Sequence, residues 1–171
     1  MSILLISGGA RSGKSRNAES HTLLLSQALG AAPIYIATAE ALDDEMRQRI
    51  LVHQARRTDV WRNIEVPLAL VDALDHSDGK GPRLVDCLTL WLSNLLHAEC
   101  DWHREARTLC EALKRQHAPV TLVTNEVGLG IVPDNPLARR FRDAAGQLNQ
   151  MIAEVADEVV FMVAGLPMKV K

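Results

Sequence analysis

The chain has 171 residues, a length typical of one domain, and 47% of them are hydrophobic, which is enough for a sizeable core. A net charge of −2 does not favour nucleic acid or an anionic membrane through bulk charge. No apolar run approaches the roughly 20 residues that span a bilayer, and glycines follow the short N-terminal ILLI run where a signal peptide would have a cleavage site. We therefore expect a single domain over residues 1–171 in the cytoplasm, with no nucleic-acid partner and no membrane span.

The pattern of hydrophobic residues predicts strands that alternate with helices. Strands are predicted at residues 3–6, 34–36, 84–86, 120–124 and 158–163. Helices are predicted at residues 14–29, 42–57, 68–74, 88–97, 102–117 and, from one apolar stripe, 137–155. Because helices separate the strands, we expect an α/β fold of three layers with a mostly parallel central sheet.

Four polar groups follow predicted strands at their carboxyl ends. They are the segment 8–15, Thr38, Asp86, and the pair Asn125 and Glu126. Ligands of parallel α/β sheets bind beyond the carboxyl ends of the strands. We therefore expect these groups, which are distant in sequence, to converge on one edge of the sheet.

The segment GGARSGKS at residues 8–15 fits the phosphate-binding P-loop, and it lies between a predicted strand and a predicted helix, as that loop requires. Its glycines let backbone N–H groups turn toward phosphate oxygens, and the positive end of the next helix faces the same anion. Lys14 would reach the β and γ phosphates, and the Ser15 hydroxyl would bind Mg²⁺. Arg11 either helps to neutralise phosphate or points to solvent. The motif predicts a P-loop NTPase fold of the RecA-like type.

Asp86 ends the predicted strand 83–86, and an acid at this place in a P-loop protein usually binds Mg²⁺. The alternative is an N-cap of the helix that follows. No guanine-reading Asn-Lys-x-Asp element is present, so these residues leave a kinase, another transferase and an ATPase open.

A histidine lies on the charged amphipathic helix predicted at 42–57. Met46, Arg49, Ile50 and His53 have the spacing of one helix face. Arg49 could hold a phosphate and keep the imidazole of His53 neutral by repulsion between like charges. A neutral imidazole is a nucleophile that can carry a covalent intermediate. The other interpretation is a surface histidine on a charged helix, and these residues alone favour it.

Sequence segments along nearly the whole chain resemble those of a known family. The matching segments include GGARSGKSR at 8–16, YIAT at 35–38, LDDEM at 42–46, RI-x-x-H at 49–53, VDCLT at 85–89, VTNEVG at 123–128 and LAR at 137–139. In combination they resemble the bifunctional adenosylcobinamide kinase / adenosylcobinamide-phosphate guanylyltransferase of bacterial cobalamin biosynthesis. This combination is far more specific than the P-loop alone.

The resemblance implies two reactions. The first phosphorylates the hydroxyl of the aminopropanol arm of adenosylcobinamide with ATP or GTP. The second transfers GMP from GTP to that phosphate through a guanylyl-histidine intermediate, giving adenosyl-GDP-cobinamide and pyrophosphate. The catalytic residues implied are Lys14 and, as the nucleophile, His53, with Mg²⁺ held by Ser15 and Asp86. A homotrimer is also implied.

The nucleotide contacts implied by the family fall on three segments of this chain and on two single residues. Glu65 is our candidate for reading guanine N1–H and its amino group, and the alternative is a solvated charge. The full set is Gly8, Gly9, Ala10, Arg11, Ser12, Gly13, Lys14, Ser15, Ala37, Thr38, Ala39, His53, Gln54, Ala55, Arg56, Glu65 and Asp86.

Two groups of polar residues each allow two interpretations. Asn125 and Glu126 contact substrate or belong to a structural loop. Arg139, Arg140 and Arg142 form a solvated face, or contact nucleotide or a neighbouring subunit. Two other functions also stay open: a kinase of another small alcohol, and a regulatory module that binds nucleotide without turnover.

Overall fold

The computed structural model describes residues 2–40, 44, 47–48 and 59–171. Within this part of the chain, seven strands form one sheet in the order β3-β2-β4-β5-β1-β6-β7. All neighbouring strands are parallel except β6 and β7, which form an antiparallel pair. The strands are β1 (Ile3–Gly8), β2 (Ile34–Ala37), β3 (Arg62–Glu65), β4 (Arg83–Asp86), β5 (Val120–Val123), β6 (Glu158–Val163) and β7 (Leu166–Lys169).

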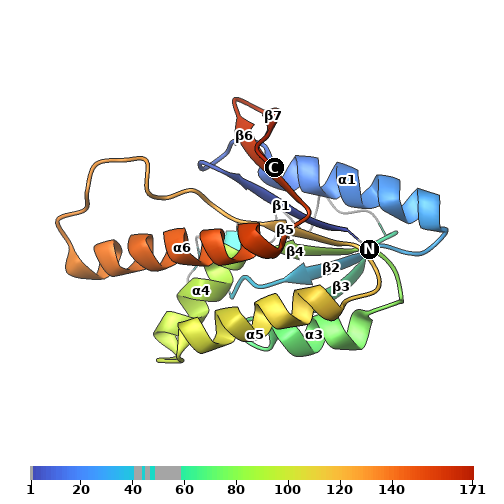
Figure 1. The fold of residues 1–171 in the computed structure, drawn as a ribbon, viewed down its shortest axis with the longest axis horizontal. Helices are drawn as coiled ribbons and strands as arrows, with labels where there is room; N and C mark the ends of the chain where they lie inside the picture. Colours follow the sequence, from blue (N-terminus) through green and yellow to red (C-terminus); the bar gives the residue numbers. More distant parts are fainter. Residues whose placement is uncertain (1, 41–43, 45–46, 49–58) are drawn as a thin grey trace.

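Helices cover both faces of this sheet, as Figure 1 shows. Helix α1 (Lys14–Leu29) lies on one face. The other face carries α3 (Leu70–Ser77), α4 (Leu88–His97), α5 (Trp102–Arg115) and α6 (Pro136–Val155). The predicted three-layer α/β architecture with a mostly parallel sheet is confirmed. Most of the helix predicted at 42–57 lies outside the described residues, and no helix in the described part is long and apolar enough to cross a membrane.

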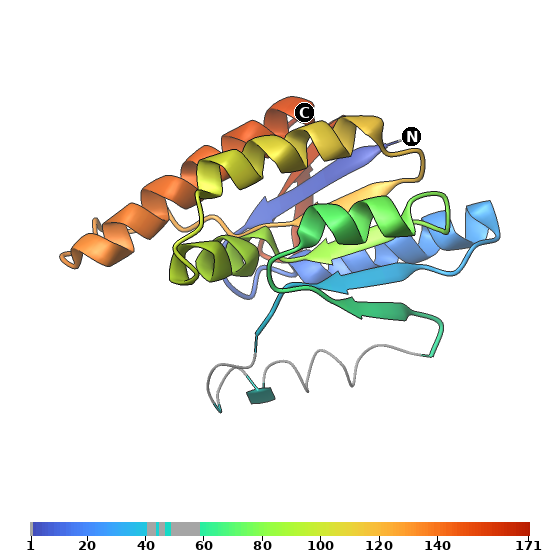
Figure 2. The ribbon, with the colours of Figure 1, turned by 90° about the horizontal axis from the view of Figure 1, so that it is seen from below.

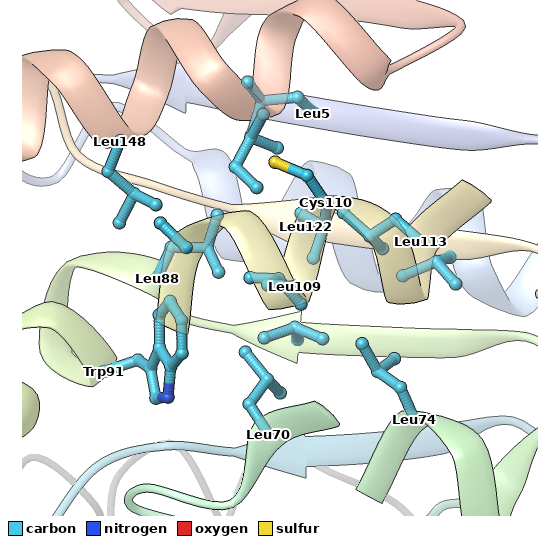
Figure 3. Close-up of a cluster of buried hydrophobic side chains, with 14 of the residues drawn as sticks. Leu5, Leu70, Leu74, Leu88, Trp91, Leu109, Cys110, Leu113, Leu122 and Leu148 are labelled. Atoms are coloured by element: carbon cyan, nitrogen blue, oxygen red, sulfur yellow. The ribbon is translucent and has the colours of Figure 1, made fainter. Parts of the chain in front are cut away.

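The pleat of the strands divides the core into two clusters. In β1, Leu4 and Ile6 pack on the side of α1, whereas Ile3 and Leu5 pack on the side of α3 to α6. The larger cluster joins Leu5 and Leu122 of the sheet to leucines from all four helices of that face, with Trp91 among them (Figure 3). Fully burying one such leucine contributes about 2 kcal/mol before entropy is subtracted. This packing fixes the sheet under the strand ends that carry the candidate site.

Three elements differ from the sequence-based prediction. The strand β3 was not predicted, because its residues Arg62–Glu65 are polar and mostly exposed at the sheet edge. The strand β7 was not predicted either, since it is an exposed partner of β6 beyond the turn at Ala164 and Gly165. The helix predicted at 68–74 lies at Leu70–Ser77, so it begins two residues later and ends three residues later than predicted.

A buried ion pair lies at the amino end of β4, the end opposite the predicted site. The guanidinium of Arg83 is 0% exposed; Nη1 donates to Asp78 Oδ1 at 2.8 Å and Nη2 to Gln116 Oε1 at 2.7 Å. Asp78 also accepts from the backbone N–H groups of His117 and Ala118. Burial acts to raise the pKa of Asp78, but these donors hold the pKa well below its usual range.

Replacing Asp78 with alanine should destabilise the protein, because the charge of Arg83 would stay buried without its partner. We expect a loss of about 3 kcal/mol in the free energy of unfolding at pH 7, measured by urea denaturation. The folded-state pKa of Asp78 is depressed, so its contribution is present above the unfolded pKa of about 3.9 and declines as the pH falls below it. The variant should therefore lose part of the acid sensitivity of the wild type.

The matched control is Asp72→Ala, which removes an exposed acid in the first turn of α3, the helix that Asp78 follows as C-cap. Equal stabilities of the Asp78 and Asp72 variants would contradict the role assigned to the buried pair.

Candidate functional site

Three backbone angles shape the loop between β1 and α1. Gly8, Arg11 and Gly13 all have positive φ, at 151°, 54° and 92°. At Gly8 a Cβ atom would lie 2.9 Å from the backbone oxygen of Met162 and 2.9 Å from Ser12 Oγ, which is too close for any side chain. The loop therefore needs glycine at Gly8 for both conformation and space. It ends at the N-terminus of α1, where the unpaired N–H groups of a helix favour an anion.

Lys14 folds back over this loop. Its side chain is buried, and Nζ donates to the backbone oxygen of Gly9 at 2.5 Å. Burial lowers the pKa of the Lys14 ammonium, and the nearby Asp86 carboxylate opposes that shift. The hydroxyl of Ser12 is also buried, and it has no hydrogen-bond partner among the described residues. The loop thus holds a cation and an unsatisfied hydroxyl, both suited to phosphate oxygens.

The register of the sheet brings the other predicted residues to the same edge. Ala37 of β2 pairs with Glu65 of β3 and with Asp86 of β4, and Asp86 pairs with Val123 of β5. The arrowheads of these parallel strands point the same way in Figure 2. The neighbours Ile64 and Val85 pack with the larger core on the other face. By alternation along each strand, Glu65 and Asp86 lie on the α1 face, toward the phosphate loop.

Asp86 is held by an aromatic residue. The hydroxyl of Tyr35 donates to Asp86 Oδ2 at 2.7 Å, and the Tyr35 ring meets Trp61 edge to face with centroids 5.6 Å apart. Within the described part of the chain the carboxylate of Asp86 makes no other hydrogen bond, so Oδ1 is available there to a further ligand. The alternative role as an N-cap is not seen, because Cys87 is the N-cap of α4 and no side chain caps that helix. Burial, with the charge of Asp86, raises the pKa of the Cys87 thiol to about 12, so this cysteine stays protonated.

A buried asparagine links two of the strand ends. Asn94 of α4 donates through Nδ2 to the backbone oxygens of Thr38 and Pro67, at 2.8 and 3.0 Å. Thr38 Oγ1 in turn donates to the Cys87 oxygen and accepts from the Cys87 N–H. These bonds fix the segment 37–39 relative to β3 and β4. The sequence analysis assigned no role to Asn94 or Tyr35. An asparagine among the leucines of the helix LTLWLSNLLH is a signal that could have drawn attention to Asn94.

Four predicted site residues, His53, Gln54, Ala55 and Arg56, lie outside the described residues, and so does Arg49. The structure places the others, Gly8 to Ser15, Ala37, Thr38, Ala39, Glu65 and Asp86, on or next to one edge of the sheet. Among the described residues there is no cluster of three or more His, Cys, Asp or Glu that could hold a metal by itself.

Two arginines of the basic cluster on α6 make contacts within the chain. Arg139 donates to the backbone oxygens of Pro133 and Asp134, and Arg142 pairs with Asp143. In the loop before this helix, Glu126 Oε1 accepts from the N–H of Gly128. Arg139 and Glu126 therefore shape the loop 126–135, which extends beyond the sheet in Figure 1.

Comparison with known proteins decides the family. Residues 4–170 match the CobU family, described as cobinamide kinase / cobinamide phosphate guanyltransferase. The chain belongs to this family. It is 51% identical to the bifunctional adenosylcobalamin biosynthesis protein CobP of Pseudomonas aeruginosa, covering 98% of this chain and 96% of that protein. It is 42% identical to the bifunctional protein CobU of Escherichia coli, covering 99% of each.

Membership of the cobinamide kinase family confirms the enzyme class predicted from the sequence.

Solved structures support the fold independently. A KaiC-like protein of Pyrococcus horikoshii matches with a TM-score of 0.52 at 13% identity, over 94% of this chain and 70% of that one. The flagellar accessory protein FlaH of Methanocaldococcus jannaschii matches with a TM-score of 0.57 at 12% identity, over 99% and 78%. The predicted RecA-like P-loop fold is confirmed.

The two adjacent glycines of the loop provide a matched test. Gly8→Ala would force a Cβ against Met162 and hold a residue at φ 151°, whereas at Gly9 a Cβ meets nothing within 4 Å. We expect Gly8→Ala to weaken GTP binding at least about tenfold, because the strained loop moves its N–H groups. Gly9→Ala should bind GTP within about threefold of wild type. Isothermal titration calorimetry measures both, and equal affinities of the two variants would show that the loop does not hold the nucleotide.

Proposed function

We propose that one nucleotide site on this sheet edge serves both reactions of the family. ATP or GTP would bind in the loop 8–15 and phosphorylate adenosylcobinamide. GTP in the same loop would then supply GMP to adenosylcobinamide phosphate, giving adenosyl-GDP-cobinamide and pyrophosphate. The observation that carries this proposal is the convergence of the loop, Lys14 and Asp86 on one edge, in a chain that matches the family over residues 4–170.

Phosphoryl transfer depends on positioning and on neutralising charge. Lys14 already lies over the loop, bonded to Gly9, and a bound β or γ phosphate would replace that carbonyl as its partner. The Ser15 hydroxyl and the Asp86 carboxylate supply oxygen ligands of the kind that Mg²⁺ prefers. When bound, Mg²⁺ would offset the negative charge of the phosphates, and it would take its remaining ligands from phosphate and water.

Guanylyl transfer needs attack at the α phosphorus, and we propose His53 as the nucleophile. Its imidazole nitrogen would form a bond to the α phosphorus of GTP while the bond from that phosphorus to the α–β bridging oxygen breaks, and pyrophosphate leaves with the electron pair. A phosphate oxygen of adenosylcobinamide phosphate would then displace His53 from the adduct. Support comes from the position of His53 in the Arg-Ile-x-x-His segment and from membership of the family.

In this proposal the guanine base binds next to β3 and β2, at the end of the sheet order. Glu65 ends β3 at the level of Ala37, so its carboxylate could accept from guanine N1–H and from the amino group. The segments Ala37 to Ala39 and Gln54 to Arg56 would contact the nucleotide beside it. Asn94 stiffens this region by joining Thr38 to Pro67.

Labelling with GTP that carries ³²P at the α position tests the nucleophile. Wild type should retain label that is stable to alkali and lost in acid, as expected of a phosphoramidate. His53→Ala should retain none, yet it should still phosphorylate adenosylcobinamide, because the kinase step does not use the imidazole.

The matched control for that experiment is His76→Ala. His76 is an exposed histidine near the end of α3, bonded to the Asp72 backbone oxygen. It should label like wild type. Full labelling of His53→Ala, or none of wild type, would refute His53 as the nucleophile.

We further propose a homotrimer that acts in the cytoplasm, where ATP and GTP are available. Apolar side chains on the segment 127–137 support contact with another copy, since Leu129 is 82% exposed, Ile131 98% and Leu137 65%. Native mass spectrometry should find three copies of the 18.8 kDa chain, and Ile131→Asp should shift the population toward monomer. A wild type that stays monomeric at micromolar concentration would contradict this assembly.

A further inference from the structure

Asn125 lies just beyond β5, close to the proposed nucleotide site but without a role in it so far. Two hydrogen bonds continue the parallel ladder past the end of that strand: Thr124 N–H donates to the Ile6 oxygen and Glu126 N–H to the Gly8 oxygen, both at 3.0 Å. Because Ile6 pairs with Val123, Asn125 lies level with Gly8, the first residue of the phosphate loop. In the sheet order, β5 lies between β4, which carries Asp86, and β1.

The alternation of side chains decides which way Asn125 points. Leu122 packs in the core on the side of α3 to α6, and Val123 packs on the side of α1. Thr124 points back to the first side, where its hydroxyl donates to Asn149 Oδ1 of α6 at 2.6 Å. Asn125 therefore faces the α1 side, together with Asp86 and Lys14.

The backbone of Asn125 is anchored by side chains of two helices. Its N–H donates to Thr89 Oγ1 of α4 at 2.7 Å, and its carbonyl oxygen accepts from Asn149 Nδ2 at 3.2 Å. Its own side chain is half-buried, and the amide takes part in no hydrogen bond within the described part of the chain. An amide with a fixed backbone and unused donors is preorganised for a ligand.

We propose that the side-chain amide of Asn125 donates a hydrogen bond to the γ-phosphoryl group, and that Asn125 is thus a catalytic residue of the kinase reaction. The proposal rests on nucleotide binding in the loop 8–15, as proposed above. In that site the loop and Lys14 would enclose the β phosphate, and the terminal phosphate would then extend toward the strand ends between Gly8 and Asp86. Asn125 lies level with Gly8, in the strand next to that of Asp86.

The chemistry of the kinase step explains what such a donor does. The hydroxyl oxygen of adenosylcobinamide forms a bond to the γ phosphorus, and the bond from that phosphorus to the β–γ bridging oxygen breaks. The nucleoside diphosphate leaves with the electron pair, and the hydroxyl proton passes to water. Negative charge is spread over the oxygens of the moving phosphoryl group, where a neutral, fixed donor stabilises the transition state.

The guanylyl step places a different demand on Asn125. The bond that breaks there joins the α phosphorus to its bridging oxygen, and the γ phosphate leaves unchanged within pyrophosphate. An amide aimed at the γ group therefore contributes to one reaction and contributes little to the other. This selectivity separates a catalytic role from a structural one, which would affect both reactions alike.

The test compares the two reactions in the same variants. In Asn125→Ala we expect kcat of the kinase reaction with ATP and adenosylcobinamide to fall about 10- to 100-fold, with KM for ATP changed by less than about threefold. Self-guanylylation with α-labelled GTP should stay within about threefold of wild type. Asn125→Ser keeps a donor and should recover part of the kinase rate, whereas Asn125→Asp, with a charge and no donor, should be slower than alanine.

Controls distinguish this role from loosening of the loop. Asn149→Ala removes the anchor of the backbone and should slow both reactions together. Melting temperatures should be unchanged in the Asn125 variants, because their backbone bonds do not use the side chain. An equal loss of both reactions in Asn125→Ala, or an unchanged kinase kcat, overturns the proposal. Retention of both activities in Lys14→Ala would instead refute the nucleotide site itself.

Discussion

The register between the parallel strands is the constraint on which the site depends. Ala37, Glu65 and Asp86 reach the nucleotide edge at one level because β2 pairs with both of its neighbours at the same residue. A slip of one residue in any strand would turn its terminal side chain to the opposite face of the sheet. The two core clusters prevent that slip in β1, β2, β4 and β5, since each of these strands buries alternate residues on both faces. The exposed edge strand β3 is held in register by its pairing with β2. Packing far from the edge thus determines which polar groups meet there.

Hydrogen bonds from buried side chains next to this edge then hold the strand ends in the positions that the register gives them. Asn94 joins the ends of β2 and β3, while Thr89 and Asn149 anchor the backbone beyond β5. These side chains come from α4 and α6, on the face opposite α1. Because these anchoring side chains come from the other face, they do not occupy the α1 face of the edge, where the triphosphate would bind. In the proposed mechanism, one bound triphosphate is attacked either at its γ phosphorus or at its α phosphorus, depending on which nucleophile is presented.

The sequence was sufficient for the features that depend on strong local signals. The helices at 14–29 and 88–97 were predicted with the bounds that the structure has, and the P-loop lies between β1 and α1 as expected. The two edge strands have no hydrophobic pattern that would predict them. Strand β3 is polar, and β7 is exposed and is defined by its pairing with β6. The bonds made by Tyr35 and Asn94 were equally inaccessible, since they join residues distant in sequence through the packed sheet. Family resemblance, and not residue spacing, identified His53 and the corrinoid substrate, and the contacts of His53 stay a prediction.

In the proposed mechanism a single triphosphate lies across this edge, with each reacting phosphorus next to its own set of residues. A crystal structure with a GTP analogue that carries a nitrogen between the β and γ phosphorus atoms tests it most directly. We expect the loop 8–15 to wrap the β phosphate, the Asn125 amide to lie within hydrogen-bond distance of a γ oxygen, and His53 to approach the α phosphorus. A triphosphate bound away from Lys14, or an α phosphorus beyond the reach of His53 in the closed complex, would contradict it.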